Sequence, residues 1–165
     1  MPGLLSNIIE MIKPLDEGAM AEALSRQDIL TKPQGSLGRL EELSIKLAGI
    51  QGKAIPRIKH KAVITMAGDH GVVVEGVSAY PGEVTAQMIY NFLNGGAGIN
   101  VLARQVGARV VVVDMGVAVE LEPSPRLISK KVAPGTQNMC LCPAMTIEQA
   151  VTSIESGIEV VGAEV

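Results

Sequence analysis

The chain has 165 residues, which suits one ordinary domain with a sizeable core. Hydrophobic residues make up 47% and charged residues 19%, a composition that excludes a disordered chain. The net charge is -3, the basic residues are scattered and only 2% of residues are aromatic, so nucleic acid is not an expected partner. No apolar run reaches the ~18 residues of a membrane helix, and no basic segment precedes the first apolar residues. We therefore expect a cytoplasmic protein that does not bind membranes.

Three helices are predicted before the first strand. Pro14 ends the first helix, and the second covers roughly residues 16–26. Ser36 is expected to cap the third, which closes at Gly52 and Pro56. The apolar face of the first helix consists of Leu5, Ile8, Ile9 and Ile12, and that of the third of Leu37, Leu40, Leu43, Leu47 and Ile50. We interpret residues 1–56 as an N-terminal helical subdomain.

Strands and helices alternate in the next part of the chain. Strands are predicted at residues 61–67 and 109–115, and helices at 83–92 and 99–105. The β-branched run at residues 110–113 is typical of a strand buried on both faces, and strand–helix–strand order favours a right-handed crossover in a parallel sheet. Residues 116–145 hold four prolines and are expected to be irregular connections. The predicted class is α/β, with residues 57–165 forming the first part of a parallel-sheet domain.

The last predicted helix begins with a capping box formed by Thr146 and Gln149. An apolar stripe of core-type residues then runs through Ile147, Ala150, Val151, Ile154, Ile158, Val161 and Val165, which indicates a packing partner further along the chain. Because this stripe continues to the last residue, we interpret the chain as the N-terminal portion of a longer protein. The alternative is a small α/β domain whose last helix frays.

Asp69 and His70 follow directly after the first predicted strand, within the turn Gly68-Asp69-His70-Gly71. Ligands of α/β proteins bind beyond the carboxyl ends of the strands, so this turn is a candidate binding site. Adjacent residues rarely converge on one metal ion, and a loop that satisfies backbone groups at the strand end is the stronger interpretation for metal purposes.

The loop and helix that follow carry further candidate residues. Ser78, Tyr80, Pro81 and Gln87 lie between the strand and the next helix and could contact a flat ligand. Composition alone slightly favours ordinary turn chemistry followed by an exposed helix face. The glycines at 95, 96 and 98 could cradle a phosphate, but they follow a helix, which favours a tight turn between helices.

The two cysteines, Cys140 and Cys142, stand two residues apart. A disulfide at this spacing is strained, and two thiols alone cannot complete a zinc site. We interpret them as reduced packing thiols, which agrees with a reducing compartment.

Several ordered motifs resemble one enzyme family. They are KPQGSLGRLE at residues 32–41, AGDHGV at 67–72, GVSAYP at 76–81, NGGAGIN at 94–100 and VDMGV at 113–117. Together they are similar to nicotinate-nucleotide:dimethylbenzimidazole phosphoribosyltransferases, and the resemblance covers essentially the whole chain. It implies transfer of phosphoribose from nicotinate mononucleotide to 5,6-dimethylbenzimidazole, giving α-ribazole 5'-phosphate and nicotinate, in cobalamin nucleotide-loop assembly.

The resemblance also implies a homodimer, a parallel Rossmann-like three-layer sheet with a small helical domain, and no metal or organic cofactor. Ser78, Tyr80 and Pro81 would line the benzimidazole pocket, with an amide that aligns at Gln87 or at Met88. Asp69, His70 and Asp114 would shape its floor. The family's catalytic glutamate lies downstream of Val165, so we assign no catalytic residue and expect these 165 residues alone to be inactive.

Two other functions stay open at this point. One is a non-catalytic or regulatory module that binds an aromatic base or the full-length enzyme. The other is a metal hydrolase that uses Asp69 and His70, which would require stoichiometric bound metal.

Overall fold

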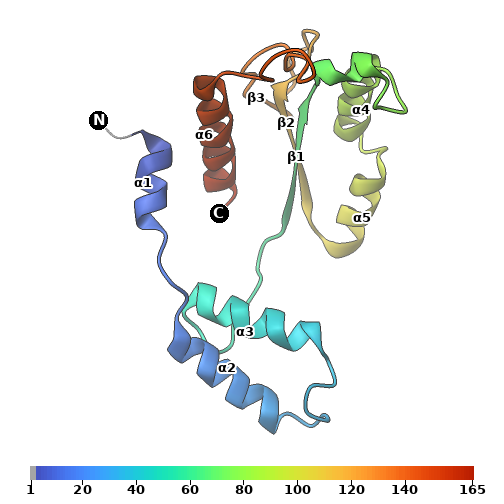
Figure 1. Ribbon diagram of the computed structural model, residues 1–165. Coiled ribbons are helices and arrows are strands. Elements are labelled where there is room, and N and C mark those ends of the chain that lie inside the picture. The colour runs from blue at the N-terminus through green and yellow to red at the C-terminus, as the bar shows by residue number, and fades with distance from the viewer. Residues whose placement is uncertain (1–2) are drawn as a thin grey trace. The chain divides into compact units, whose positions relative to one another are not determined.

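The computed structural model describes residues 3–165 and divides them into two compact units. One unit is Ile8–Lys59, and the other is His60–Val165 with the described part of Met1–Asn7. Figure 1 shows the elements, which are α1 (Leu4–Met11), α2 (Glu17–Ile29), α3 (Arg39–Gln51), β1 (Ala62–Gly68), the 3-10 helix η1 (Gly71–Glu75), α4 (Glu83–Leu93), α5 (Gly98–Val106), β2 (Arg109–Gly116), β3 (Leu127–Ser129) and α6 (Ile147–Glu164). Among the described residues, no helix has the length and apolar character needed to cross a bilayer.

The three N-terminal helices are confirmed, but the expected cap of the third is not. Asp16 caps α2 by accepting the Ala19 N–H at 2.9 Å. The prediction that Ser36 caps α3 is wrong, because α3 begins at Arg39 after Gly38. Gly35 and Gly38 both have positive φ, and the Ser36 N–H donates to the Pro33 carbonyl. Ser36 therefore lies inside a glycine-bounded turn, and the helix begins two residues later than a Ser36 cap would place it.

Small side chains form the contact between α2 and α3. The buried residues of the two helices are Ala19, Ala23, Ala48 and Gly49. On the face predicted to be apolar, by contrast, Leu40 is 65% exposed. A Cβ at Gly49 would lie 2.7 Å from the Met20 side chain, so the helices approach closely here. This unit buries little of its large apolar surface within itself.

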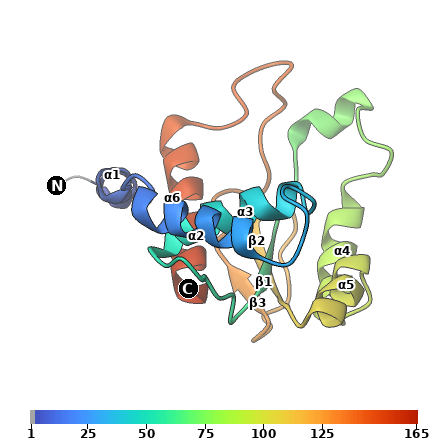
Figure 2. The same cartoon turned by 90° about the horizontal axis from the view of Figure 1, so that it is seen from below.

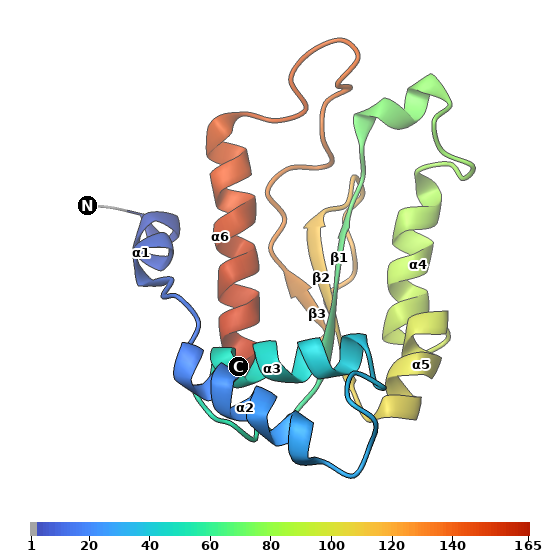
Figure 3. The same ribbon diagram turned by 60° about the horizontal axis from the view of Figure 1, so that its bottom comes forward.

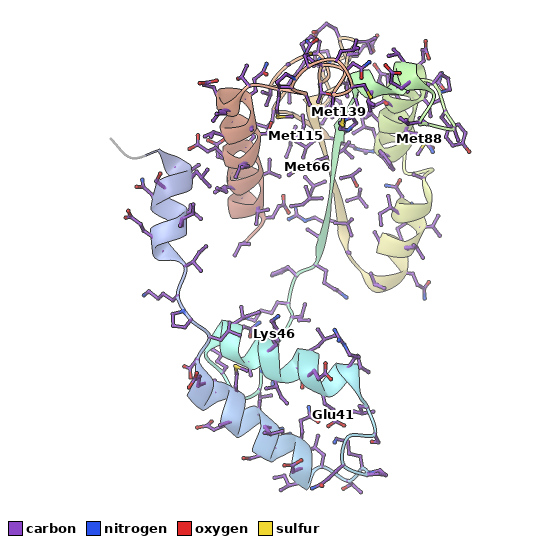
Figure 4. The ribbon with its side chains drawn as sticks, viewed as in Figure 1. Glu41, Lys46, Met66, Met88, Met115 and Met139 are labelled. Atoms are coloured by element: carbon purple, nitrogen blue, oxygen red, sulfur yellow. The ribbon has the colours of Figure 1, made fainter. Side chains whose placement is uncertain are left out.

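A carboxylate near the start of α3, Glu41, holds the turn that precedes the helix (Figure 4). Its Oε1 accepts from Lys32 Nζ at 2.8 Å and from the Leu37 N–H at 3.1 Å. These bonds, the one from Lys32 foremost, lower the pKa of Glu41 below its ordinary 4.5.

The sheet is parallel throughout, with strand order β1-β2-β3. Figures 1 and 2 show it between α6 on one face and α4 with α5 on the other. Side chains of β2 alternate between these faces: Val112 packs in a cluster with Ile89, whereas Val111 and Val113 pack with Val160. The predicted α/β class is confirmed, as are both predicted strands and the helices between them.

The stretch predicted to be irregular, residues 116–145, contains the third strand. β3 is only three residues long, and Leu127 pairs with Val112. A strand this short carries too few residues to show a period of two, and its pairing partner lies in β2. The tight turn predicted between α4 and α5 is confirmed: Gly95 has φ +77°, and Asn100 donates to the Phe92 carbonyl.

Helix α6 has the predicted capping box but packs with a different face. The Gln149 N–H donates to Thr146 Oγ1, and the Thr146 N–H donates to Gln149 Oε1 at 2.9 Å. Its buried residues are Ser156 and Val160, whereas Ile147, at the start of the predicted stripe, is 80% exposed. Ile154 and Val161 are exposed as well, whereas Ala150, Val151 and Ile158 are half-buried, so most of the large apolar side chains of the stripe do not pack on the described sheet. The small face lets the helix approach the sheet, where a Cβ added at Gly157 would lie 3.8 Å from Met66 Cε.

Candidate functional site

The loops that follow all three strands meet at Asp69. The Asp69 N–H donates to the carbonyl of Gly116, the last residue of β2, and Asp69 Oδ2 accepts the N–H of Ala118 in the following loop at 2.8 Å. Its carbonyl accepts the Thr136 N–H from the chain after β3 at 3.0 Å. Figure 3 shows these segments gathered beyond the carboxyl ends of the strands. Asp69 therefore joins three loops that are distant in sequence.

Gly71 marks the closest backbone approach at this edge. Its N–H donates to the carbonyl and to Oγ1 of Thr136, at 3.1 and 3.2 Å. A Cβ at this position would lie 2.6 Å from backbone atoms of Thr136, Gln137 and Asn138. Only glycine allows the two loops to pack at this distance.

Asp114, near the end of β2, is 2% exposed, and its side chain accepts hydrogen bonds from the backbone. Its Oδ1 accepts the Gly116 and Val117 N–H groups at 3.0 and 2.8 Å. Lys131 Nζ lies 3.6 Å from its other oxygen and compensates the buried charge. Asp114 lies outside the cavities around Asp69 and instead lines a separate one with Glu120.

Three cavities share Asp69 and His70. The first, of about 400 Å³, lies against α4 and is also lined by Ser78, Tyr80, Pro81 and Met88. The second, of about 450 Å³, reaches Glu83, Ala118 and Thr136. The third, of about 230 Å³, lies toward α6 and is lined by Met66, Met115, Met145 and Gln149. Figure 4 labels Met66 and Met115, which belong to neighbouring strands.

The structure brings six of the seven predicted site residues to the 400 Å³ cavity: Asp69, His70, Ser78, Tyr80, Pro81 and Met88. Gln87 is exposed and is not among the residues that line these cavities. Of the two alternatives for the amide position, the cavity is lined by Met88. Ser78 Oγ donates to the Tyr80 carbonyl at 2.8 Å, so turn chemistry accounts for this hydroxyl, while the Tyr80 side chain is 69% exposed.

Sequence reasoning missed the contribution of the chain after β3. From this part of the chain, Thr136 and Met145 line cavities beside Asp69, and the strand residues Met66 and Met115, which were also missed, line one of them. A Pro-Gly-Thr turn at residues 134–136 was an available signal, but without β3 there was no reason to place it at this edge. The methionines carried no polar character that would mark them.

The two cysteines correct a further prediction. Cys140 and Cys142 are free, but both are exposed and not packed in a core. Within residues 3–165, no three His, Cys, Asp or Glu side chains are grouped as a metal ion would require.

Comparison with known proteins places the chain in a family. A family model described as "Phosphoribosyltransferase" matches residues 12–165. The chain belongs to this phosphoribosyltransferase family. A relative from Roseiflexus, named nicotinate-nucleotide--dimethylbenzimidazole phosphoribosyltransferase, is 61% identical over 94% of this chain and 44% of its own length. A relative of the same name from Dehalococcoides mccartyi is 57% identical over 98% of this chain and 46% of its own.

A solved member of the family has the same fold. The crystal structure of the Thermus thermophilus enzyme that bears this name superposes with a TM-score of 0.86 at 47% identity. The match covers 91% of this chain and 46% of that one. The chain thus spans less than half the length of these family members.

Proposed function

We propose that this chain is part of a pentosyltransferase that moves phosphoribose from nicotinate mononucleotide to 5,6-dimethylbenzimidazole, giving α-ribazole 5'-phosphate and nicotinate for cobalamin nucleotide-loop assembly. The family membership and the names of the relatives support this reaction. The observation that carries the proposal is the 400 Å³ cavity at the carboxyl end of β1, where a phenol, a proline and a methionine lie beside Asp69 and His70. A largely apolar cavity with a few polar groups suits a flat aromatic base.

Each side chain of the cavity has a proposed role. The ring of Tyr80 offers a face for stacking, and Pro81 and Met88 supply apolar contact. Asp69 and His70 form the floor, which the neighbouring cavities share, so a ribose carrier could approach the base from the adjoining space. This half of the enzyme would bind and orient the base.

The reaction itself needs a general base to accept a proton, and this arrangement of residues does not supply one. A benzimidazole nitrogen attacks C1' of the ribose, nicotinate leaves with the bond electrons, and the proton on the benzimidazole N–H passes to a carboxylate. Asp69 already uses Oδ2 to hold the Ala118 N–H, which suits a structural role better than proton transfer. The general base, worth roughly 10²- to 10⁴-fold, is therefore proposed to be a glutamate beyond residue 165.

Steady-state kinetics of the protein at its natural length test the pocket. Tyr80→Ala and Met88→Ala should raise the KM for dimethylbenzimidazole, the former by roughly 2- to 10-fold, because a stacking partner worth about 0.5–1.5 kcal/mol is lost. The KM for nicotinate mononucleotide should stay unchanged. Gln87→Ala is the matched control on the same helix and should behave like the natural protein. A raised KM for Gln87→Ala with no effect of Met88→Ala would contradict the assignment.

Residues 1–165 alone should form no α-ribazole phosphate above a blank without enzyme. Product formation by this segment would mean that the catalytic general base lies within residues 1–165. Binding of dimethylbenzimidazole without turnover by the full-length protein would instead favour the non-catalytic base-binding module.

We further propose that the whole protein is a cytoplasmic homodimer, that residues 1–56 and 57–165 form separate domains, and that the sheet is part of a Rossmann-like domain. The family resemblance supports the dimer, the Rossmann-like sheet and a small helical domain, and the exposed apolar side chains of α3 are suited to an interface. Light scattering of the full-length protein tests the dimer: a monomer mass at working concentration would reject it.

A further inference from the structure

His70 lies at the junction of the three cavities, because it lines each of them together with Asp69. The two neighbours differ in what holds them. Asp69 is fixed through its N–H, its carbonyl and its carboxylate. The His70 carbonyl accepts the Val73 N–H at 3.0 Å, but among residues 3–165 its imidazole ring has no hydrogen-bond partner. The ring is exposed, so both of its nitrogens are available to a ligand.

His70 is also the one basic side chain at this edge. Of the described residues that line the three cavities, none besides His70 is a lysine, an arginine or a histidine, whereas Asp69 and Glu83 are acidic. Nicotinate mononucleotide carries two anionic groups, a phosphate and a ring carboxylate. A phosphate ordinarily takes arginine, lysine or several backbone N–H groups as partners, whereas a single imidazole is enough for a carboxylate. The composition of the cavities therefore favours the ring carboxylate as the partner of His70.

The cavity toward α6 suits the ring that carries this carboxylate. Its volume of about 230 Å³ is below the roughly 300–1,000 Å³ of sites that enclose drug-sized ligands, so one aromatic ring fits better than a whole nucleotide. Met66, Met115 and Met145 line it, and methionine sulfur makes favourable contacts with aromatic rings. Gln149 lies at its α6 side, and because its Oε1 accepts a backbone N–H in the capping box, its amide N–H groups are the part left for an anion.

We propose that His70 binds the carboxylate of nicotinate and that the methionine-lined 230 Å³ cavity holds its ring. This role rests on the proposed function. The benzimidazole nitrogen attacks C1' from the side opposite to the departing nicotinate, which gives the α product, so base and nicotinate need separate cavities on either side of the ribose. The 400 Å³ and 230 Å³ cavities meet this need, since both contain His70. The contact also selects the substrate, because nicotinamide has a neutral amide in place of the carboxylate.

Kinetics with two nucleotides test this role in the protein at its natural length. The donors are nicotinate mononucleotide and nicotinamide mononucleotide, which differ only in the group that His70 is proposed to bind. We expect the natural protein to favour the acid by roughly 10- to 100-fold in kcat/KM, as for a hydrogen bond to a charged group. His70→Ala should bring this ratio close to one by raising the KM for nicotinate mononucleotide, and the KM for dimethylbenzimidazole should stay unchanged. His70→Gln, which keeps one N–H donor, should restore part of the preference.

Two further variants separate recognition of the carboxylate from other effects. His60→Ala removes the other histidine of the chain, an exposed residue before β1, and should leave the ratio unchanged. Met66→Ser should raise the KM for both nucleotides to the same extent, because the ring contact does not depend on the carboxylate. The Tm of His70→Ala should equal that of the natural protein, since its exposed ring makes no hydrogen bond within the described residues.

Calorimetric titration with free nicotinate and free nicotinamide measures the contact without turnover. The natural protein should bind nicotinate more tightly, and His70→Ala should bind the two equally. An equal rise of KM for both nucleotides in His70→Ala, or an unchanged acid preference in that variant, would overturn the role while leaving the proposed transfer intact. Absence of α-ribazole phosphate from either donor, with nicotinate still bound through His70, would instead reject the proposed function and support the contact.

Discussion

The two units of this chain are held together by different means. In Ile8–Lys59, the buried residues of α2 and α3 are alanines and a glycine, and large side chains such as Leu40 stay exposed. In His60–Val165, Ile89, Val113 and Val117 are fully buried, and the loops at the carboxyl edge are joined through backbone hydrogen bonds. The comparison shows that the candidate site is held in place by a packed core and by closely packed loops that are joined through backbone hydrogen bonds. The helical unit, taken alone, is stabilised mainly by helix caps and by side-chain pairs that are close in sequence, such as Lys32 with Glu41.

Truncation of the core should give the largest difference between the units. Ile89→Ala removes a fully buried side chain from the cluster with Val112 and should lower the free energy of unfolding by about 2–5 kcal/mol. Leu40→Ala in α3, at an exposed position, should change it by about 0.5 kcal/mol or less. Urea denaturation measures both. A large loss for Leu40→Ala in the full-length protein would mean that another part of the protein covers this face.

The second largest effect is expected at Gly71. Gly71→Ala places a methyl group 2.6 Å from three backbone atoms, and because backbone cannot rotate away, we expect a loss of about 1–3 kcal/mol. Gly162→Ala in α6 is the control: its Cβ meets nothing within 4 Å, so it should be neutral or stabilising by up to about 1 kcal/mol. Equal stability of the two variants would show that the loops at residues 71 and 136–138 are not tightly apposed.

Loss of a helix cap should lower the free energy of unfolding by less than Gly71→Ala does, and by the same amount in both units. Asp16→Ala removes the cap of α2, and Thr146→Ala removes that of α6. Each should lower the free energy of unfolding by about 1 kcal/mol, since one N–H at the helix start loses its partner. Thermal unfolding of both variants checks this. A cap effect confined to α6 would show that the stability of the Ile8–Lys59 unit does not depend on the cap of α2.

The smallest effect concerns the turn before α3. The hydrogen bond from Lys32, followed by that from the Leu37 N–H, lowers the pKa of Glu41 below 4.5. A lowered carboxyl pKa stabilises the folded state at pH values above 4.5, and the contribution is lost as pH falls through the folded pKa. Glu41→Gln should flatten this acid dependence in a stability–pH series. An identical acid profile for the variant and the natural protein would reject the contribution.

Most helices and two of the three strands were predictable because they carry local signals. The capping box at Thr146 and the β-branched run at residues 110–113 each lie within a few residues of the element they specify. The position of Asp69 and His70 at the candidate site also followed, because the strand-end rule needs only the strand and its turn.

The features that escaped prediction depend on residues far away in the sequence. Helix α6 has a large apolar face at Ile147, Ile154 and Val161 and a small face at Ser156 and Val160, and the sheet packs on the small one. Hydrophobicity alone marks the large face and does not show which face the sheet takes, because it ignores the distance at which the helix must pack. The hydrogen bond from Gly71 to Thr136 could not be predicted either, because no residue near Gly71 in the sequence indicates its partner.

The parallel register has a consequence for how the chain folds. Ala62 pairs with Arg109, so β1 gains no partner until β2 has been synthesised and the long connection has closed, which makes such pairing slow. On the ribosome, α2 and α3 can pair soon after they emerge, because they are neighbours in sequence. The edge at Asp69 is complete only once Thr136 has been synthesised. The candidate site is thus the late product of folding, and the apolar β1 strand is the nascent segment that a chaperone would need to shield.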